Sequence, residues 1–306
     1  MSELAIGIDI GGTKTEAVAI SLPSRSHAES FNILNRTRIS TQAHLGFDAL
    51  VKNIAAFIAQ FSSAYPEVTA IGIGMPGSTD GEGRVQNSNT TCLNGQFFHQ
   101  ALQGALAQKL IFANDANCFA KAEAVLGAGS GHPMVFGIIM GTGVGGGLTF
   151  DGAFRNGPHS ICGEWGHTTL WPEHPVPCYC GKYGCVEQFL SGPGVESHYR
   201  ALSGQTAPLK NILQLAQMGD AFAVQCIDTF LDNYGRAVSN LINILDPDAI
   251  VLGGGVSNVD LLYTRGYSRI LKYVFSSECH TPVVKNQLGD SAGVLGAALL
   301  CRDDCH

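Results

Sequence analysis

Two glycine-rich segments repeat one pattern within the chain. Gly7 to Ile20 (GIDIGGTKTEAVAI) and Gly137 to Phe150 (GIIMGTGVGGGLTF) align without a gap at an offset of 130 residues. Each consists of an apolar run, a tight glycine turn and a second short apolar run, which is the pattern of a β-hairpin. Glycine within a strand also lets a ligand or a second backbone approach closely. The repeat therefore predicts two related lobes built on one plan.

The sequence around the hairpins alternates between helical and strand patterns, which indicates an α/β fold with mixed sheets. We expect an N-terminal lobe at 1–117 and a C-terminal lobe at 118–290, with the final helix, about 291–306, packing back on the first lobe. The expected helices are Phe47–Tyr65, Gln96–Leu106, Ala116–Leu126, Asn211–Met218, Ala221–Ile244 and Gly293–Leu300, and the expected strands are Thr69–Gly74, Leu110–Ala113 and Ala249–Leu252.

Composition excludes several classes of protein. Hydrophobic residues at 45% and charged residues at 14% describe a folded chain of 306 residues rather than a disordered one. A net charge of −7 argues against nucleic acid or an anionic membrane as the partner. The N-terminus lacks the pattern of a signal peptide, and no apolar run reaches the roughly 18 residues of a membrane helix. We therefore expect a cytoplasmic protein with reduced thiols.

The glycine turns are suited to binding phosphate. A run such as DIGGTKT points several backbone N–H groups into one concavity, and Thr13, Lys14 and Thr15 add donors and a positive charge. A tight hairpin without a ligand is the alternative for one such turn. A second copy at 141–147 and a third glycine run at 253–255 favour a nucleotide cleft, although neither a P-loop nor a dinucleotide fingerprint is present.

Two acidic residues are candidates for phosphoryl-transfer chemistry. Asp9 occupies the position in the first hairpin where the second has Ile139, and a carboxylate beside a phosphate turn predicts Mg²⁺, bound directly or through water. Asp115 follows a short apolar strand and begins a helix. It is either part of a helix N-cap or a general base that accepts the proton of a substrate hydroxyl.

Three of the chain's 10 cysteines lie within eight residues, CYCGKYGC, from Cys178 to Cys185. Such spacing allows a metal site, a disulfide or a redox pair. A reducing compartment disfavours the disulfide, and the absence of C-x-x-C disfavours a thioredoxin-like pair. The remaining seven cysteines show no ligand spacing and are interpreted as ordinary thiols.

These motifs together resemble the ROK family of sugar kinases and sugar-responsive repressors. The resemblance rests on DIGGTKT, the Pro-Gly after Met75, NDAN, GTGVGGG, GEWGH, CYCGKYGCVE and the later GGG, in that order along nearly the whole chain. It implies an actin-like, ribonuclease H-like ATPase fold with two lobes, with ATP and a sugar bound in the interlobe cleft. It also implies Asp115 as the catalytic base and suggests a homodimer.

The resemblance implies three sets of site residues, and some residues fall in two of them. Nucleotide and Mg²⁺ would be bound by Asp9, Gly11, Gly12, Thr13, Lys14, Thr15, Gly141, Thr142, Gly143, Gly254 and Gly255. The sugar would be bound by Asn89, Asn114, Asp115, Glu164, His167 and Glu187. A structural Zn²⁺ would be bound by His167, Cys178, Cys180 and Cys185.

A closed Cys₃His site is suited to Zn²⁺ and leaves no position open for water. We interpret it as a support for the sugar loop, with one nitrogen of His167 on zinc and the other facing the sugar.

The predicted activity is transfer of the γ-phosphate of ATP to O6 of a hexose. Fructose is placed first because the segments 87–98 and 257–263 and the cysteine loop look like the bacterial fructokinase or mannokinase type. Kinases of N-acetylglucosamine, glucose or mannose are the alternatives. A DNA-binding repressor is disfavoured because the first strand begins too near Met1 for a helix-turn-helix domain. A non-catalytic sugar-responsive regulator is disfavoured because Asp9 and Asp115 are both present.

Overall fold

A computed structural model describes residues 3–22, 31–173 and 176–303. The chain divides into two compact units. Unit 1 is Met1–Pro133, Gly147–Cys162 and Gln287–His306, and unit 2 is Met134–Gly146 and Gly163–Asn286. The predicted lobes, 1–117 and 118–290, have other bounds. The first helix after residue 114 belongs wholly to unit 1, because it packs against the last helix of the chain. No helix among the described residues is both long and apolar enough to cross a membrane.

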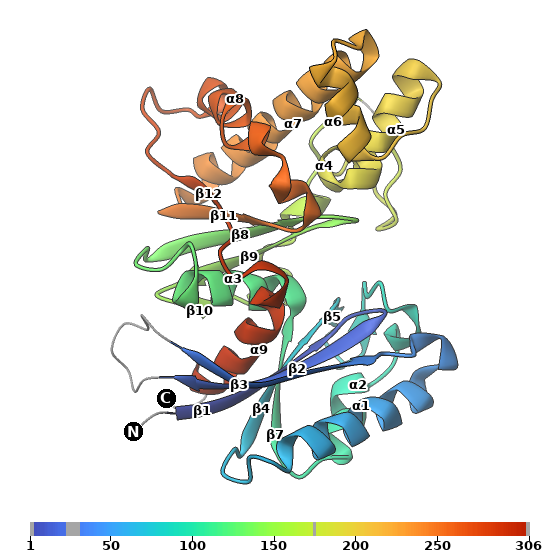
Figure 1. The fold of residues 1–306 in the computed structure, drawn as a ribbon, viewed down its shortest axis with the longest axis vertical. Helices are drawn as coiled ribbons and strands as arrows, with labels where there is room; N and C mark the ends of the chain where they lie inside the picture. Colours follow the sequence, from blue (N-terminus) through green and yellow to red (C-terminus); the bar gives the residue numbers. More distant parts are fainter. Residues whose placement is uncertain (1–2, 23–30, 174–175, 304–306) are drawn as a thin grey trace. The chain divides into compact units, whose positions relative to one another are not determined.

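The described residues form two five-stranded mixed sheets whose strand orders correspond position by position (Figure 1). The orders are β3-β2-β1-β4-β7 and β10-β9-β8-β11-β12. In the first sheet β1 pairs antiparallel with β2 and parallel with β4, and in the second β8 adjoins β9 and pairs parallel with β11. This correspondence confirms the duplicated plan that the glycine repeat predicts. The strands are β1 (Glu3–Ile10), β2 (Lys14–Leu22), β3 (Asn32–Ser40), β4 (Ala70–Met75), β7 (Lys109–Asn114), β8 (Met134–Met140), β9 (Val144–Phe150), β10 (Ala153–Phe154), β11 (Ala249–Gly253) and β12 (Val283–Lys285), with a separate short pair β5 (Ser78–Thr79) and β6 (Val85–Gln86).

Helices cover both faces of the first sheet. On one face, α1 (Phe47–Ser62) and α2 (Phe98–Gly104) bury an apolar core against the strands. On the other face α9 (Ala292–Asp303) packs on β1 and β4 and against α3 (Asp115–Leu126). A Cβ on Gly7 would lie 2.2 Å from the carbonyl oxygen of Val294. Such contact is below any normal packing distance, so glycine here lets the helix backbone lie directly on the strand.

Unit 2 carries a helical layer beside its strands. The long helix α7 buries one side along most of its length and packs against α5, α6 and α8. The helices of this unit are α4 (Glu187–Leu190), α5 (Gly192–Ser203), α6 (Leu209–Gln217), α7 (Ala221–Leu245) and α8 (Arg265–Tyr273).

The expected elements are present, with ends shifted by a few residues. Among the described residues, the sequence patterns missed β3, β12, α5 and α8, as well as the short elements β5, β6, β10 and α4. The start of α5 is hidden by the sequence GPG, yet the Ser191 side chain caps it by accepting the backbone N–H of Gly194, and a proline occupies the first turn. Serine followed by proline is a helix-start signal that apolar periodicity alone does not detect.

Candidate functional site

In unit 1 the candidate residues gather where three parallel strands end. β1 runs into the turn at 11–13, β4 ends beside Gly77, and β7 ends at Asn114. The register places Asp9 beside Gly74, and Met75 beside Asn114. Ligands in open α/β sheets bind outside the carboxyl ends of parallel strands, so this edge is where the sheet offers a site.

Asn114 and Asp115 have different roles at the start of α3. Asn114 is the N-cap: its side-chain oxygen accepts the N–H of Ala116 at 2.9 Å, and its Nδ2 donates to the carbonyl of Gly77 at 3.0 Å. The Asp115 carboxylate also accepts the Ala116 N–H, at 2.8 Å, and its side chain is half-buried. The N-cap reading therefore applies to Asn114. Asp115 lies in the positive field of the helix N-terminus, which favours a carboxylate.

Asp9 lies in a charged and crowded position. Burial, together with the nearby carboxylates of Asp115 and Glu16, raises its pKa to about 7 against the opposing effect of Arg38. A Cβ on Gly293, the second residue of α9, would be 3.1 Å from Asp9 Oδ2. The first helical turn of α9 therefore covers this carboxylate. Carboxylates this close together repel each other, and a divalent cation bound beside them would offset that repulsion.

The first glycine turn is held by hydrogen bonds on its buried side and is exposed to solvent on its other side. The buried Thr15 hydroxyl bonds to that of Thr41 at 2.9 Å, and Thr41 donates in turn to the carbonyl of Gly11 at 2.7 Å. Gly12, Thr13 and Lys14 are exposed. Thr15 thus supports the turn from inside the protein, while the three residues before it face solvent.

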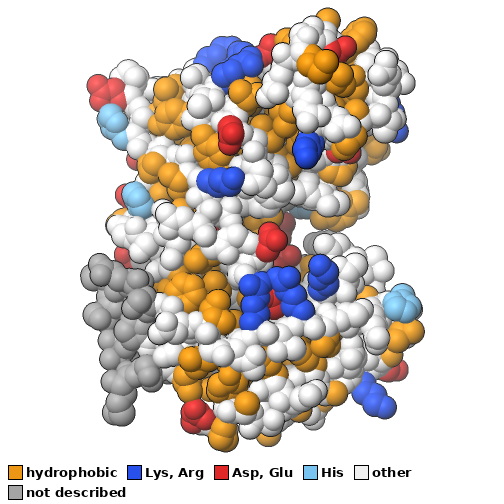
Figure 2. Space-filling view, viewed as in Figure 1, with side chains coloured by type: hydrophobic (Ala, Val, Ile, Leu, Met, Phe, Trp, Pro, Cys, Tyr) orange, Lys and Arg blue, Asp and Glu red, His pale blue; other side chains and the backbone are white. Residues whose placement is uncertain are grey.

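A cluster of basic side chains lies over the same sheet (Figure 2). Arg36 and Arg38 of β3 both bind the carboxylate of Glu16, Arg38 at 2.7 Å. This ion pair lies beside Asp9, because Asp9 and Glu16 are direct cross-strand neighbours. Glu16 thereby holds Arg38 close to the carboxylate whose charge Arg38 moderates.

Unit 2 brings the other two glycine runs together. The backbone N–H of Gly141 bonds to the carbonyl of Gly143, two residues on, at 2.9 Å; the equivalent N–H of Gly11 in the first hairpin bonds to the carbonyl of Lys14, three residues on, also at 2.9 Å. A Cβ on Gly141 would lie 3.9 Å from the backbone nitrogen of Gly255. The two turns follow β8 and β11, which are parallel neighbours, so they form one glycine-lined edge.

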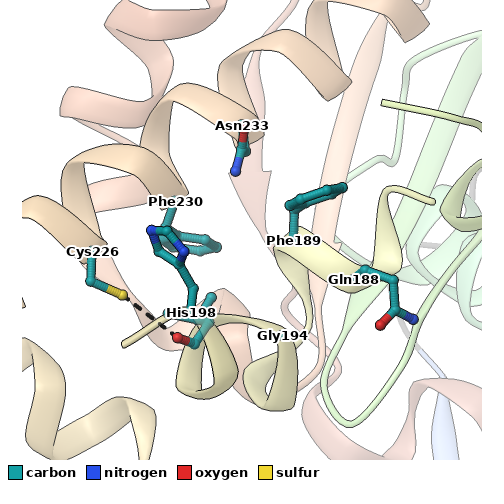
Figure 3. A pocket seen from close by; sticks show the side chains of 8 residues that line it. Gln188, Phe189, Gly194, His198, Cys226, Phe230 and Asn233 are labelled. Carbon is teal, nitrogen blue, oxygen red and sulfur yellow. Dashed lines mark hydrogen bonds between the residues drawn. The ribbon is translucent and has the colours of Figure 1, made fainter. Parts of the chain in front are cut away.

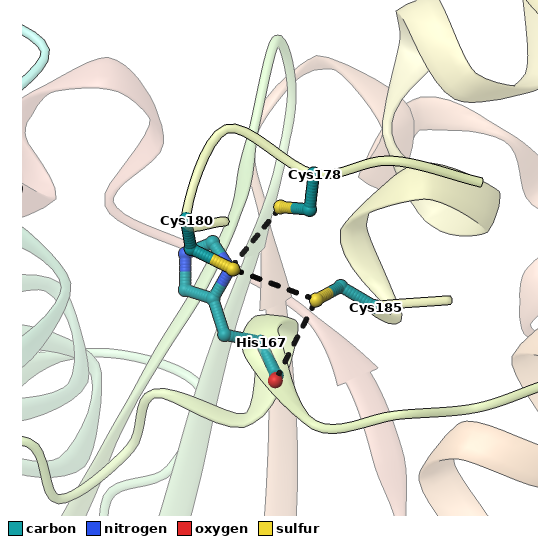
Figure 4. Close-up of side chains that lie close together, drawn as sticks. All are labelled: His167, Cys178, Cys180 and Cys185. Atoms are coloured by element: carbon teal, nitrogen blue, oxygen red, sulfur yellow. Dashed lines mark hydrogen bonds between the residues drawn. The ribbon is translucent and has the colours of Figure 1, made fainter. Parts of the chain in front are cut away.

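Three cysteines and one histidine converge in unit 2 (Figure 4). The Nδ1 of His167 is 3.6 Å from the Sγ of Cys178, and the Sγ atoms of Cys180 and Cys185 are 3.7 Å apart. All four ligand atoms lie within 4.8 Å of one another. Zinc–sulfur bonds of about 2.3 Å in a tetrahedron separate two sulfurs by about 3.7 Å. The donor set and its spacing therefore fit a structural zinc ion. The thiols are unpaired, since a disulfide needs sulfurs about 2 Å apart.

Burial raises the pKa of Cys185 to about 12, with hydrogen bonds to Cys180 and Cys178 as further causes. Binding of a metal ion at this thiol is therefore coupled to release of its proton.

The second nitrogen of His167 meets a residue that the motifs did not indicate. His167 Nε2 is 3.0 Å from the hydroxyl of Tyr179, whose ring packs edge-on against the imidazole. Burial, together with the nearby carboxylates of Glu187 and Glu164, raises the pKa of Tyr179 to about 12. Tyr179 therefore stands among three of the predicted sugar contacts. The sequence feature that could have identified Tyr179 is its position between two cysteine ligands.

Glu164 and Glu187 differ in their surroundings. Burial raises the pKa of Glu164, and Glu187 raises it further, while His167 lowers it. Glu187 is 8% exposed, and its Oε2 accepts the backbone N–H of Val144 at 2.9 Å. One oxygen of Glu187 is thus bound to the strand that leaves the second glycine turn.

Comparison with known proteins identifies the family. The chain matches the ROK family over residues 5–304. The chain belongs to the ROK family.

Within that family the chain is similar over its whole length to sugar kinases. It is 36% identical over 304 residues to an N-acetyl-D-glucosamine kinase of Aliivibrio salmonicida, covering 96% of this chain and 98% of the relative. It is 34% identical over 301 residues to an N-acetylgalactosamine kinase of Shewanella, covering 96% and 95%. Among solved structures, a ROK hexokinase from Thermus thermophilus has 28% identity and a TM-score of 0.84, with 97% of each chain covered. A ROK glucokinase from Streptomyces griseus, in complex with glucose and AMPPNP, has 28% identity and a TM-score of 0.75, covering 98% of this chain and all of that one.

The relatives favour the N-acetylglucosamine alternative over fructose, and the structure shows another role for residues in the segments that suggested fructose. The tetrapeptide LNGQ, at 93–96, closes a loop: the Asn94 side chain accepts the N–H of Ser88 and donates to its carbonyl, both at 2.9 Å. In the segment 257–263, the Tyr263 hydroxyl donates to the carbonyl of Ser257 at 2.7 Å. Both side chains form hydrogen bonds to the backbone of their own segment. Their presence in the sequence is therefore explained by the structure of the loop, without a contact to the sugar.

The same loop holds the predicted residue Asn89, which is exposed. Its neighbour Thr90 is buried, and its hydroxyl has no hydrogen-bond partner. A Cβ on Gly12 would lie 3.6 Å from that oxygen. Thr90 therefore stands beside the first glycine turn, where sequence reasoning had not placed it.

A small pocket in unit 2 is separate from these residues (Figure 3). It lies among α4, α5 and α7, has a volume of about 20 Å³, and contains the buried, unpartnered Nε2 of His198. That volume accommodates about one water molecule. It is too small for a sugar or nucleotide. The pocket is lined by Gln188, Phe189, Gly194, Val195, His198, Cys226, Phe230 and Asn233.

Proposed function

We propose that this ROK-family sugar kinase is an ATP-dependent kinase of N-acetylhexosamines, with N-acetyl-D-glucosamine as its preferred acceptor and O6 as the phosphorylated oxygen. The observation that carries the chemistry is the pair Asp9 and Asp115 at the carboxyl ends of β1 and β7, the parallel strands on either side of β4, with Asp115 half-buried at a helix N-terminus. The sugar is supported by the 36% identity to an N-acetyl-D-glucosamine kinase along 98% of that relative.

Asp115 would act as the general base. Its carboxylate takes the proton of the sugar's O6 hydroxyl as the oxygen forms a bond to the γ-phosphorus and the bond from that phosphorus to the β-γ bridging oxygen breaks. In phosphoryl transfer such a residue chiefly orients the nucleophile, because the transition state is loose. Asn114 fixes the backbone at this point through its bonds to Gly77 and Ala116.

Backbone N–H groups would bind the phosphates. The exposed residues Gly12, Thr13 and Lys14 offer donors and one positive charge, and the second turn offers Gly141, Thr142 and Gly143. Gly254 and Gly255 complete the second edge. A Mg²⁺ ion that accompanies the nucleotide would be held at Asp9, where it would offset the mutual repulsion of the carboxylates.

The Cys₃His cluster would hold one structural zinc ion through His167 Nδ1 and the three thiolates, which leaves no ligand position for water. With Nδ1 on the metal side, Nε2 carries the ring proton and donates it to Tyr179. The hydroxyl proton of Tyr179 is then directed away from His167. We therefore add Tyr179 as a sugar contact beside the predicted contact Glu164, and we replace with it the direct contact that the sequence predicted for His167.

The test is a steady-state panel of acceptors with Mg²⁺-ATP. N-acetylglucosamine, N-acetylgalactosamine, N-acetylmannosamine, glucose, mannose and fructose are compared by ADP release, and the product is located by ³¹P NMR. We expect the highest kcat/KM with N-acetyl-D-glucosamine and a 6-phosphate product. A higher kcat/KM with fructose than with every N-acetylated sugar would refute the assignment of the sugar. ATP turnover that no sugar increases would refute the kinase assignment.

A further inference from the structure

The cysteine cluster and the second glycine turn are adjacent in unit 2. Cys185 is separated from Glu187 by a single residue, and all three residues of this stretch are buried. The Sγ of Cys178 lies 3.9 Å from Glu187 Oε1. On its other side Glu187 reaches the start of β9 through the 2.9 Å bond from Oε2 to the N–H of Val144. One side chain therefore contacts both features.

The glycine turn is shaped around this carboxylate. A Cβ on Gly143 would lie 2.8 Å from Glu187 Oε2, so only glycine leaves room for the carboxylate at its bonding distance. The carbonyl of Gly141 accepts the N–H of Gly192, which comes just after α4 in the chain. Both ends of the turn are thus tied to the segment 187–192 that follows the last cysteine.

The start of β9 is fixed by the other ligand-bearing segment as well. The indole N–H of Trp165 donates to the carbonyl of Gly145 at 3.1 Å. A Cβ on Gly166 would lie 2.1 Å from the carbonyl oxygen of Val144. Trp165 and Gly166 directly precede His167. The residues next to the histidine ligand and to the last cysteine ligand therefore contact the same short piece of strand, at 144–145.

We propose that Glu187 is a positioning residue that couples the Cys₃His cluster to the nucleotide-binding turn at 141–143. Its Oε2 accepts the Val144 N–H, and the metal-bound cluster fixes the backbone at Cys185, two residues before Glu187. Loss of the metal, or of the acceptor at Oε2, loosens the turn and weakens nucleotide binding without any sugar present. This inference rests on the proposed function only for the role of the turn as a nucleotide site. It holds whichever group meets Oε1.

The test compares Glu187→Gln with Glu187→Met by calorimetric titration with Mg²⁺-AMPPNP in the absence of sugar. Glutamine keeps a side-chain oxygen that accepts the Val144 N–H, whereas methionine has similar length and no such acceptor. We expect the glutamine variant to bind AMPPNP within about twofold of the wild type and the methionine variant to bind it about tenfold more weakly. Circular dichroism and zinc content confirm that both variants are folded and loaded.

A second arm works through the cluster. Cys180→Ser is expected to lose zinc and to weaken AMPPNP binding, and the double variant with Glu187→Met is expected to bind no more weakly than Glu187→Met alone, because both changes break one connection. The same test can be made on the wild type, without a substitution that could impair folding, by removing zinc with a chelator and then adding it back. We expect the affinity for AMPPNP to fall when zinc is removed and to return when it is restored. Unchanged AMPPNP affinity in zinc-free protein, or in a folded Glu187→Met variant that has lost only sugar affinity, would overturn the coupling. A wild type that binds no AMPPNP would instead overturn the proposed function.

Discussion

Replacing Asp9 with asparagine should stabilise the metal-free protein at neutral and alkaline pH. Asp9 has an ordinary carboxyl pKa of 3.8 in the unfolded chain and a pKa of about 7 in the folded protein. The folded state therefore binds a proton that the unfolded state has released, so this group lowers stability as the pH rises from about 4 to about 7. Asparagine has the same shape and no charge, which removes this effect.

The magnitude follows from the shift. A difference of roughly 3 pKa units corresponds to about 4 kcal/mol at 1.36 kcal/mol per unit. Solvent still reaches part of the Asp9 side chain, so the gain at pH 8 should fall between about 2 and 4 kcal/mol. At pH 5 most of the wild-type protein already carries the proton. The advantage of Asp9→Asn should therefore shrink to less than half.

Urea unfolding of both proteins in magnesium-free buffer, with zinc retained, measures this difference at pH 5 and pH 8. Asp151→Asn is the matched control in the same unit. Asp151 is exposed and has a positive φ of 49°, a conformation that asparagine adopts readily. Mg²⁺-ADP should stabilise the wild type more than Asp9→Asn. A stability difference that is the same at both pH values, or a less stable Asp9→Asn protein at pH 8, would refute the argument that Asp9 is a strained carboxylate awaiting a cation.

Three further experiments, with four substitutions, test the site. Asp115→Asn should lower kcat by roughly 10²–10⁴-fold in the ADP-release assay while AMPPNP affinity and the melting temperature stay near wild type, and a near-normal kcat would remove Asp115 as the base. Tyr179→Phe should raise the KM for N-acetyl-D-glucosamine several-fold with unchanged zinc content and AMPPNP affinity; an unaltered sugar KM would show that the hydroxyl serves only His167. Gly254→Ala should destabilise the protein by more than about 2 kcal/mol, because φ is +78° and the new Cβ would meet the Met140 carbonyl at 2.3 Å, whereas Gly255→Ala has open space and should keep the melting temperature. Equal melting temperatures of these two glycine variants would contradict the assigned backbone geometry.

The sequence repeat predicted the architecture because glycine turns and apolar strands are local patterns. The segment GIDIGGTKT specifies a strand, a turn and a strand by itself, and its second copy implies a second sheet of the same design. The carboxyl-end location of Asp9 and Asp115 follows from that design once the strands are known to be parallel. The Cys₃His cluster was also within reach, since three of its four ligands lie in one short loop.

What escaped prediction depends on contacts between distant segments. Nothing in the hairpin sequence shows that Gly7 lies against the backbone of α9, nearly 290 residues later. Glu187 looked like a sugar ligand because its motif ends the cysteine loop, and only the fold reveals its bond to Val144. Asn94 misled the choice of sugar for a related reason. A polar residue that closes its own loop has the same sequence appearance as one that faces a substrate.

The position of α9 also has a consequence for synthesis on the ribosome. The first sheet to leave the exit tunnel contains β1, β2 and β4, but the helix that covers its glycine face is Ala292–Asp303, at the far end of the chain. An N-terminal domain ordinarily completes its folding while the rest is being translated. Here the nascent sheet keeps one face uncovered until residues 292–303 have been translated. A stalled or truncated chain that ends before Ala292 would thus present an uncovered, glycine-lined apolar surface to chaperones and proteases.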